Sequence, residues 1–370
     1  MPVLLLVGAG HAHLHLARRA AALAAAGYQV LLLAPRYFDY SGVASATAAG
    51  VLDGSVGRID VRALAAASSL EMHEGTLESL DPQARIAVTS AGELLAYDVL
   101  SLNIGSVADP VGVHVHPSVL RVKPLRGLAE LDGRLRARGA QRAVVTVVGG
   151  GSSGVELAAH LSVRSDVAHV QLVESGAGVG AGLPAGARRR IVRLLARRGV
   201  AVHTGRVVRE LGERQLVCDD GTVIAHDVAL LAAGLTAPPL LAEIGLGDGR
   251  GVPVRATLQH VERDEVYAVG DCALFLPRAL PRIGVHGVRQ GPVLLQSLLA
   301  RARGAALPVY EPQRRALAVL DLGDGVGLAA RGGLWWYGTA ALRLKRYVDR
   351  RWLRTYQEPV PLPRAGPGKR

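Results

Sequence analysis

Two glycine-rich turns have the residue types that bind the phosphates of dinucleotide cofactors. The first is Gly8-Ala9-Gly10-His11-Ala12-His13 and the second is Gly149-Gly150-Gly151-Ser152-Ser153-Gly154. Glycines let the backbone turn tightly and come close to a pyrophosphate, and a helix that follows offers unpaired N–H groups and a positive dipole end. Each turn follows a short apolar segment and precedes an alanine-rich one. Two such turns predict two nucleotide cofactors, with electron transfer between them.

The second turn fits the dinucleotide pattern completely. Gly149, Gly151 and Gly154 hold its glycine positions, and Glu174 ends the next predicted strand, residues 170–173. A carboxylate at that place can accept from a ribose 2′-hydroxyl and would repel a 2′-phosphate. NADH is therefore favoured over NADPH, although the arginines at 188–190 are close enough in sequence to complicate the choice.

The first turn departs from the pattern. His13 stands at its third glycine position, and Ala34-Pro35 stand where an acidic residue would end the second strand, residues 30–33. A degenerate turn that binds nothing is one interpretation. Against it, a strand-like run at 265–269 leads into Gly270-Asp271 and then into a helix-compatible segment. In flavoproteins with two nucleotide domains, an Asp in that order along the chain hydrogen-bonds the FAD ribitol.

With these motifs the chain resembles the pyridine nucleotide-disulfide oxidoreductase superfamily over nearly its whole length. The closest branch resembles type II NADH dehydrogenases and, more narrowly, the flavoprotein module associated with selenophosphate synthetase. The narrower resemblance rests on five segments, namely 8–14, 40–42, 97–105, 285–292 and 342–357. A His at the third position of the first turn is usual in that group. The resemblance implies FAD in the first turn and NADH in the second.

The same resemblance implies particular binding residues. Those expected at FAD are Gly8, Gly10, His11, Ala12, Arg36, Ser41, Gly105, Gly270, Asp271, Val285 and His286. Those expected at NADH are Gly149, Gly151, Ser152, Ser153, Gly154, Glu174 and Gly234. His11 and His15 are four residues apart and would share a helix face, but no acidic or cysteine ligand lies nearby in sequence, so no metal site is expected.

Four residues are candidates for the reaction. Glu156 matches a glutamate that similar enzymes place near nicotinamide and flavin; otherwise it is a solvated carboxylate in the first turn of a helix. Residues 285–290 align with a quinone-binding signature, of which Gln290 is retained while His286 replaces a glutamine. His286 could move protons. Lys123 resembles a motif lysine that faces the flavin.

Composition narrows the chemistry further. The two cysteines, Cys218 and Cys272, form no C-x-x-C or C-x4-C pair, which argues against a redox disulfide and against disulfide or sulfide:quinone reduction. No uncharged apolar run reaches the roughly 18–20 residues of a membrane span. The start of the chain reads as a strand rather than a signal peptide. We expect a cytoplasmic protein, with a peripheral position at the inner face of the membrane as the alternative.

The motif order predicts an α/β fold with two Rossmann-like three-layer domains. Residues 1–108 and 237–310 would build the FAD domain, 109–236 an inserted NADH domain, and 311–370 a small C-terminal region with a strand at 317–322. In that last region aromatic side chains alternate with arginines, and the net charge is +12. Such a segment, if helical, suits an anionic lipid surface, or it packs on the protein itself or on a partner such as selenophosphate synthetase.

We therefore expect an FAD-dependent NADH:acceptor oxidoreductase with a quinone-like acceptor. One alternative is a flavoprotein reductase in selenium metabolism. Another is a non-catalytic flavin redox sensor whose basic surface binds membrane or nucleic acid, although nucleic acid is not favoured. A homodimer is possible. The sequence does not select among acceptors.

Overall fold

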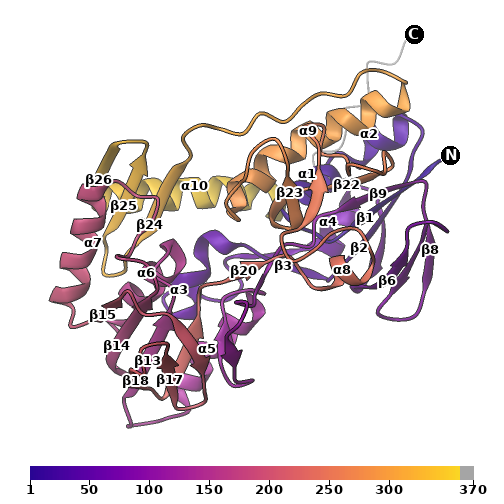
Figure 1. Ribbon diagram of the computed structural model, residues 1–370. Coiled ribbons are helices and arrows are strands. Elements are labelled where there is room, and N and C mark those ends of the chain that lie inside the picture. Colours follow the sequence, from indigo (N-terminus) through magenta and orange to yellow (C-terminus); the bar gives the residue numbers. More distant parts are fainter. Residues whose placement is uncertain (359–370) are drawn as a thin grey trace.

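The computed structural model describes residues 1–358, and its core is two parallel β-sheets (Figure 1). The first sheet has the strand order β22-β9-β1-β2-β5, and every neighbouring pair is parallel. Its strands are β1 (Val3–Val7), β2 (Gln29–Ala34), β5 (Glu71–Glu74), β9 (Val99–Leu102) and β22 (Val266–Ala268). Leu4, Leu5 and Leu6 are fully buried because β1 is central in the sheet and both faces of the sheet are covered there.

The second sheet has the order β12-β19-β13-β14-β15 and is also parallel. Its strands are β12 (Leu120–Arg121), β13 (Ala143–Val148), β14 (Val167–Glu174), β15 (Ala201–Thr204) and β19 (Val228–Leu231). The first sheet thus takes β22 from a part of the chain that follows the whole second sheet. This arrangement and the two parallel sheets confirm the predicted Rossmann-like fold class.

Helices cover both sheets. Around the first sheet lie α1 (His11–Ala17), α2 (Ala20–Ala25), α4 (Val61–Ala67), α8 (Leu240–Glu243) and α9 (Gly284–Ala302). Around the second lie α5 (Arg126–Arg136), α6 (Ser152–Leu161) and α7 (Ala185–Arg197). Between the two domains, α3 (Ala44–Ala48), which follows the short helix η1 (Ser41–Val43), contacts α5 and α6. The side chains of α3 are small, so this helix can pack closely against α5 and α6 where the two domains meet.

Short antiparallel units complete the two domains. The first group comprises the pair β3 (Tyr37–Asp39) and β4 (Arg58–Asp60) and the hairpins of β6 (Leu77–Asp81), β7 (Ile86–Thr89) and β8 (Leu94–Ala96). The second comprises β11 (His114–Val115), which is parallel to β16 (Val208–Leu211), with β17 (Gln215–Cys218) and β18 (Val223–Ala225). The chain passes between the domains at β10 (Val107–Ala108) and β20 (Leu235–Thr236), which pair with each other.

The segment after Asp271 differs from expectation. A helix-compatible run was predicted there, but the chain forms a short 3-10 turn, η2 (Gly270–Cys272), and then β23 (Ala273–Phe275), which pairs with β21 (Val252–Val254). The helix begins only at Gly284, the start of α9. Pairing with a distant strand, which local pattern does not reveal, determines the structure of this segment.

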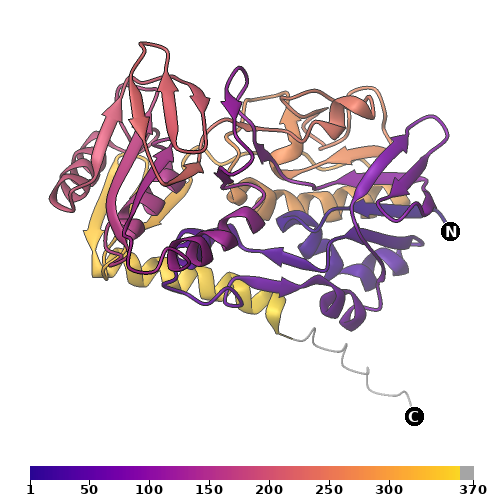
Figure 2. The same cartoon turned by 90° about the horizontal axis from the view of Figure 1, so that it is seen from below.

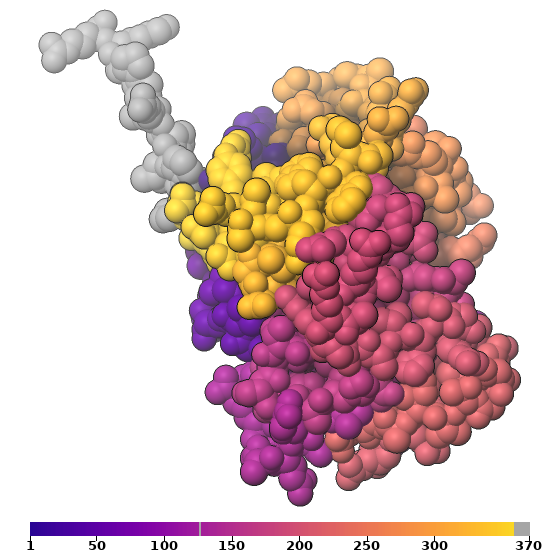
Figure 3. Space-filling view, turned by 90° about the vertical axis from the view of Figure 1, so that its left-hand side faces the viewer, coloured from indigo at the N-terminus to yellow at the C-terminus, as the bar shows by residue number. Residues whose placement is uncertain are grey.

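The C-terminal region is an antiparallel sheet followed by a long helix. Its elements are β24 (Leu317–Asp321), β25 (Gly327–Arg331), β26 (Leu334–Gly338) and α10 (Thr339–Gln357). The strand predicted at 317–322 is confirmed, whereas Trp335 and Trp336 lie on a strand rather than on the helix. From this sheet α10 extends along the molecule to the first domain (Figure 1, Figure 2). In the space-filling view the C-terminal region borders both domains (Figure 3).

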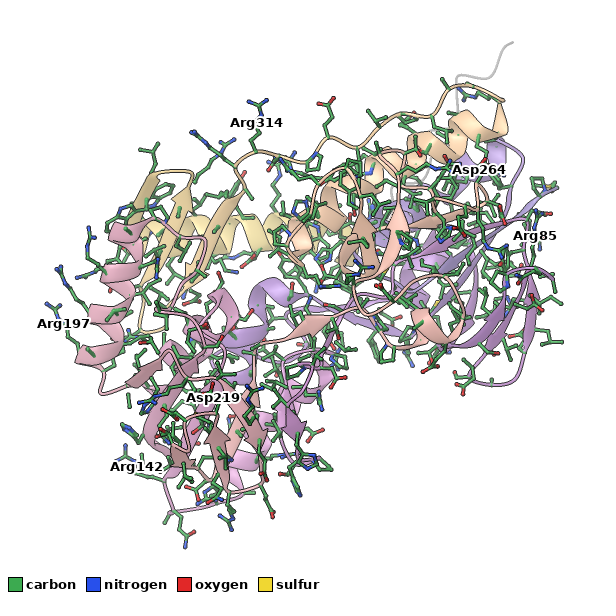
Figure 4. All side chains as sticks on the ribbon, in the orientation of Figure 1. Arg85, Arg142, Arg197, Asp219, Asp264 and Arg314 are labelled. Atoms are coloured by element: carbon green, nitrogen blue, oxygen red, sulfur yellow. The ribbon has the colours of Figure 1, made fainter. Side chains whose placement is uncertain are left out.

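Charge lies mainly on the outside. Arg85, Arg197 and Arg314 project away from the body of the molecule (Figure 4), as expected of solvated surface arginines. Within residues 1–358, the search for a helix long and apolar enough to cross a bilayer finds none.

Candidate functional site

The two glycine turns are built alike but closed differently. Each connects the end of a central parallel strand, β1 or β13, to the helix that follows, α1 or α6. Gly8 and Gly149 both have positive φ values, 87° and 110°, which a glycine adopts without strain. At the third position, a Cβ on Gly154 would lie 1.8 Å from the Gly149 carbonyl oxygen, so only glycine fits there. The corresponding residue of the first turn is His13.

His13 closes the first turn with hydrogen bonds instead of close contact. Its side chain is fully buried, with Nδ1 2.7 Å from the Gly8 carbonyl oxygen and Nε2 2.8 Å from the Ser101 hydroxyl. Because a carbonyl oxygen only accepts, Nδ1 donates to Gly8 and Nε2 accepts from Ser101. Burial lowers the pKa of His13 to about 4, so the ring is neutral at neutral pH. In the first turn, hydrogen bonds of His13 therefore hold α1 against β1 and β9, where the second turn uses close packing at a glycine.

Asn103, at the end of β9, ties the first turn to its neighbours. Its side-chain oxygen accepts from the amides of Ala12 and His13, at 3.1 and 3.2 Å, and its amide nitrogen donates to the Val269 carbonyl at 2.8 Å. A Cβ on Gly10 would lie 2.4 Å from this oxygen, so the second glycine is needed for Asn103 to reach the helix. The side chain of Asn103 therefore positions α1, β9 and the approach to Gly270 together.

The second turn is open to a ligand. The amides at 151–154 have no acceptor among the described residues, and a Cβ on Gly151 would meet no atom within 4 Å. Ser152 and Ser153 are exposed at the same helix start. Glu174 lies beside this turn, where its carboxylate accepts from the amides of Gly150 and Gly176, each at 2.6 Å. Free amides above a helix N-terminus fit a pyrophosphate, and the adjacent carboxylate fits a ribose.

Asp271 lies in a polar group near the first turn. One of its carboxylate oxygens accepts from the Ser106 hydroxyl at 2.9 Å and also pairs with the Lys123 ammonium, which itself lies 3.1 Å from the Ser106 hydroxyl. Gly105 has a positive φ of 77°, and a Cβ at this position would meet no atom within 4 Å. Lys123, Ser106 and Asp271, which are far apart in sequence, thus form one polar group, and Gly105 is next to it in the chain.

The start of α9 supports this group. Gln290 is buried, and its side-chain oxygen accepts from the Gly270 amide at 2.6 Å, so it holds the Gly270-Asp271 turn. The Nδ1 atom of His286 lies 2.9 Å from the Tyr310 hydroxyl, and burial lowers the pKa of His286. Val285 is half-buried in the first turn of α9. Gln290 therefore has a positioning role in this structure.

Glu156 lies in a cluster of charged residues between the domains. Its carboxylate accepts from the Asp321 amide of β24 at 2.7 Å. Burial raises the pKa of Glu156 to about 7, partly offset by the positive charge of Lys345. On α10, the Lys345 ammonium lies 2.7 Å from Asp349, whose other carboxylate oxygen accepts from the Tyr40 hydroxyl at 3.1 Å. The cluster joins α6, the C-terminal region and the 40–42 segment of the first domain.

Two of these residues went unrecognised in the sequence. Lys345 also donates to the Gly42 carbonyl, which places an ammonium directly on the 40–42 segment. A signal existed: Lys345 and Asp349 are the one lysine and the one acidic residue of α10, four positions apart on an otherwise arginine-rich helix. Both are more than nine-tenths buried.

The other predicted residues lie at less enclosed places. Arg36 is exposed after β2 and pairs with Asp60 at 3.4 Å, and Ser41 is exposed in η1. Gly234 follows β19, where a Cβ would lie 2.4 Å from Pro110, so a side chain there would displace the interdomain crossing. The structure thus gathers most of the predicted set around two turns and leaves Arg36 and Ser41 at the rim.

Comparison with known proteins identifies the family. The model of the pyridine nucleotide-disulphide oxidoreductase family matches residues 3–294. The type II NADH:quinone oxidoreductase of Haemophilus influenzae is 30% identical over 148 residues, which cover 36% of this chain and 33% of that one, so the match spans about a third of the relative. Ferroptosis suppressor protein 1 of Homo sapiens is 24% identical over 305 residues, covering 77% and 79%.

Solved structures share the fold. A sulfide:quinone oxidoreductase from Aquifex aeolicus superposes with a TM-score of 0.81 at 16% identity, covering 96% of this chain and 92% of that one. NDH2 from Plasmodium falciparum, solved in complex with NADH, superposes with a TM-score of 0.77 at 11% identity, covering 97% and 99%. At such identities the likeness concerns the arrangement of elements alone.

Proposed function

Because the chain belongs to the pyridine nucleotide-disulphide oxidoreductase family, we propose that it passes electrons from NADH through FAD to a quinone-like acceptor. The reaction class and the two cofactors are the expected ones for this family and for its relatives among NADH:quinone oxidoreductases and NADH dehydrogenase-like proteins. The observation that carries the proposal is the pair of nucleotide turns on two parallel sheets joined within one chain. FAD, when bound, accepts a hydride and returns its electrons to a second substrate.

NADH is assigned to the second turn. The free amides at 151–154 would hold its pyrophosphate, and Glu174 would accept from a ribose hydroxyl. Glu174 is already held by two backbone amides, so its negative charge is fixed beside the place where a 2′-phosphate would lie. That repulsion favours NADH over NADPH.

FAD is assigned to the first turn and to the group around Asp271. The free carboxylate oxygen of Asp271 would accept from a ribitol hydroxyl, while the Lys123 ammonium lies beside it as a positive charge. His11, Ala12, Arg36 and Ser41 would lie along the same cofactor. His286 at the start of α9 would face the flavin edge together with the helix N-terminus, which stabilises negative charge.

The acceptor reaction is assigned to the Glu156 cluster. Reduction of a quinone consumes protons as well as electrons, so an acid that is half-protonated near neutral pH is needed beside it. Glu156 meets this need because burial raises its pKa to about 7. Lys345, which donates to the Gly42 carbonyl, places a fixed positive charge in the same cluster. Direct transfer of electrons fits the separate positions of Cys218 and Cys272, which are both free thiols.

A lipid-soluble acceptor suggests contact with a membrane surface. Arg343, Arg346, Arg350, Arg351 and Arg354 form a basic stripe on the outer face of α10, beside a hollow of about 700 Å³ that Arg18 also lines. Leu334, Trp335 and Trp336 on β26 are exposed near the start of the same helix. Arginines with exposed aromatic side chains suit an anionic lipid surface. The selenophosphate synthetase partner stays a prediction from resemblance, and the homodimer stays a prediction without a structural test.

Turnover with a soluble quinone tests the proposed function. We expect purified protein loaded with FAD to turn over NADH repeatedly only when the quinone is present, with NADPH a far poorer donor. Sedimentation with phosphatidylserine-containing vesicles, but not with phosphatidylcholine vesicles, would support the membrane contact, and Arg350→Glu with Arg354→Glu should abolish it. FAD-loaded protein that reduces no quinone while retaining NADH oxidation by another acceptor would contradict the assignment of the acceptor.

A further inference from the structure

Trp352 lies on the inner face of α10 with an unused hydrogen-bond donor. The indole Nε1 atom is buried, and it finds no acceptor among the described residues. The helix is docked there by Leu353 and Tyr356, which are 4% and 8% exposed. A buried donor without an acceptor costs free energy, so such groups are rare unless a water, an ion or a ligand satisfies them.

The indole ring packs against the first residue of the FAD-side helix. Its centroid lies 5.0 Å from that of His11, and it stacks on Tyr40 at 4.3 Å with an angle of 16° between the planes. Phe38 lies on the other side of the same group, 5.2 Å from His11. We call His11, Phe38, Tyr40 and Trp352 the aromatic cluster. The cluster brings α10 against the glycine turn at Gly8–Gly10.

The aromatic cluster is held in place from two directions. A Cβ on Gly284 would lie 3.1 Å from the His11 ring, so the start of α9 packs closely on it. On the other side the Tyr40 hydroxyl donates to Asp349, which also pairs with Lys345. Trp352 therefore packs on His11 and Tyr40, which themselves contact the start of α9 and Asp349 of α10.

We propose that Trp352 is an FAD-binding residue, with its indole N–H donating to an oxygen of the FAD pyrophosphate or ribityl chain. This inference rests on the proposed function, because it needs FAD at the first turn. The pyrophosphate and ribityl oxygens of FAD are hydrogen-bond acceptors. The indole N–H of Trp352 would be a neutral donor to one of them, and a neutral donor needs no counterion. The aromatic cluster then closes the cofactor site with the C-terminal helix, so that α10 takes part in retaining FAD.

Two substitutions separate the N–H group from the packing of the ring. Trp352→Phe keeps an aromatic ring and removes the donor together with a small part of the indole, so we expect the FAD dissociation constant to rise about five- to tenfold, the loss of one hydrogen bond. Trp352→Ala should raise it further. Tyr347→Ala is the matched control, because Tyr347 is an aromatic residue of the same helix that is 60% exposed; it should bind FAD like the wild type.

The measurements are the FAD content of purified protein and the dissociation constant from recovery of free FAD fluorescence on dilution. Circular dichroism melting of the FAD-free proteins is the control for folding. Removing an unsatisfied donor and creating a small cavity have opposite effects, so the FAD-free Trp352→Phe protein should melt close to the wild type. Loss of packing alone would lower the melting temperature of the FAD-free protein. Weaker FAD binding with an unchanged melting temperature would therefore support the role of the indole N–H.

The outcomes separate the two proposals. Wild-type protein that binds FAD, together with a Trp352→Phe protein that binds it equally well, would overturn the role of Trp352 alone. Equal weakening by Trp352→Phe and Leu353→Ala, both with lowered melting, would also overturn it, since helix docking would then explain the effect. Wild-type protein that binds no FAD after reconstitution would overturn the proposed function and this inference with it.

Discussion

Replacing His13 by glycine tests whether the first turn is a degenerate dinucleotide motif or a differently closed one. The substitution restores the usual third glycine, so motif matching alone predicts a neutral or improved protein. The structure predicts the opposite. The change removes the hydrogen bonds of His13 to the Gly8 carbonyl and the Ser101 hydroxyl and leaves both oxygens buried. Each unsatisfied group costs roughly 1–3 kcal/mol, and glycine inside a helix costs about a few tenths of a kcal/mol more than histidine.

The total is a loss of roughly 2–6 kcal/mol, a large share of the stability of an ordinary domain. We would measure it by urea unfolding of FAD-free protein at pH 7, followed by circular dichroism. His15→Gly is the matched control, because it makes the same exchange in the same helix at a half-buried residue. A His13→Gly protein as stable as the His15→Gly protein, or one that binds FAD more tightly than the wild type, would refute this interpretation.

The remaining predictions concern charge. Burial lowers the pKa of His13 to about 4, so between pH 6.5 and 4 the unfolded chain binds a proton that the folded chain does not. The free energy of unfolding should therefore fall by roughly 3 kcal/mol as the pH is lowered from about 6.5 to 4. Urea titrations at a series of pH values measure this change. The pKa of Glu156 is raised to about 7, so the rate of quinone reduction should decline as the pH rises through 7. A Glu156→Gln protein should be slower, and its rate should not change with pH in this range. A pH–rate profile identical to that of the wild type would show that Glu156 is not the proton donor. Glu174→Ala should weaken NADH binding about tenfold and reduce the ratio of NADH affinity to NADPH affinity, which calorimetry measures. A variant that binds NADH as tightly as the wild type would contradict the role of Glu174 at the ribose.

Much of the fold could be predicted because the strands before the two turns are apolar and their turns have a known requirement. The strand expected at 30–33 lies within β2, and the one at 317–322 differs from β24 by a single residue. The error after Asp271 arose because β23 forms by pairing with β21, a contact between segments far apart in sequence. Trp335 and Trp336 lie on β26, which pairs with β25 across the two-residue Gly332-Gly333 turn; this local hairpin was missed because the aromatic and basic residues were taken together with the following helix.

The candidate site was only partly predictable. Glycines, His13 and Glu174 are local features whose positions in a turn follow from their spacing. The cluster around Glu156 is different, because Tyr40, Asp321 and Lys345 come from segments that meet only when α10 extends across both domains. Gln290 was assigned to the acceptor side by alignment, whereas its side chain accepts from Gly270 and positions Asp271. Spacing cannot distinguish a side chain that contacts a ligand from one that holds the residue beside it.

An anaerobic visible spectrum recorded during NADH titration tests the central claim most directly. We predict that purified protein, reconstituted with FAD if necessary, has an oxidised flavin spectrum that bleaches with about one equivalent of NADH, as hydride transfer between two bound cofactors requires. A flavin spectrum that stays oxidised through the titration, or a protein that binds no flavin even after reconstitution, would contradict the account.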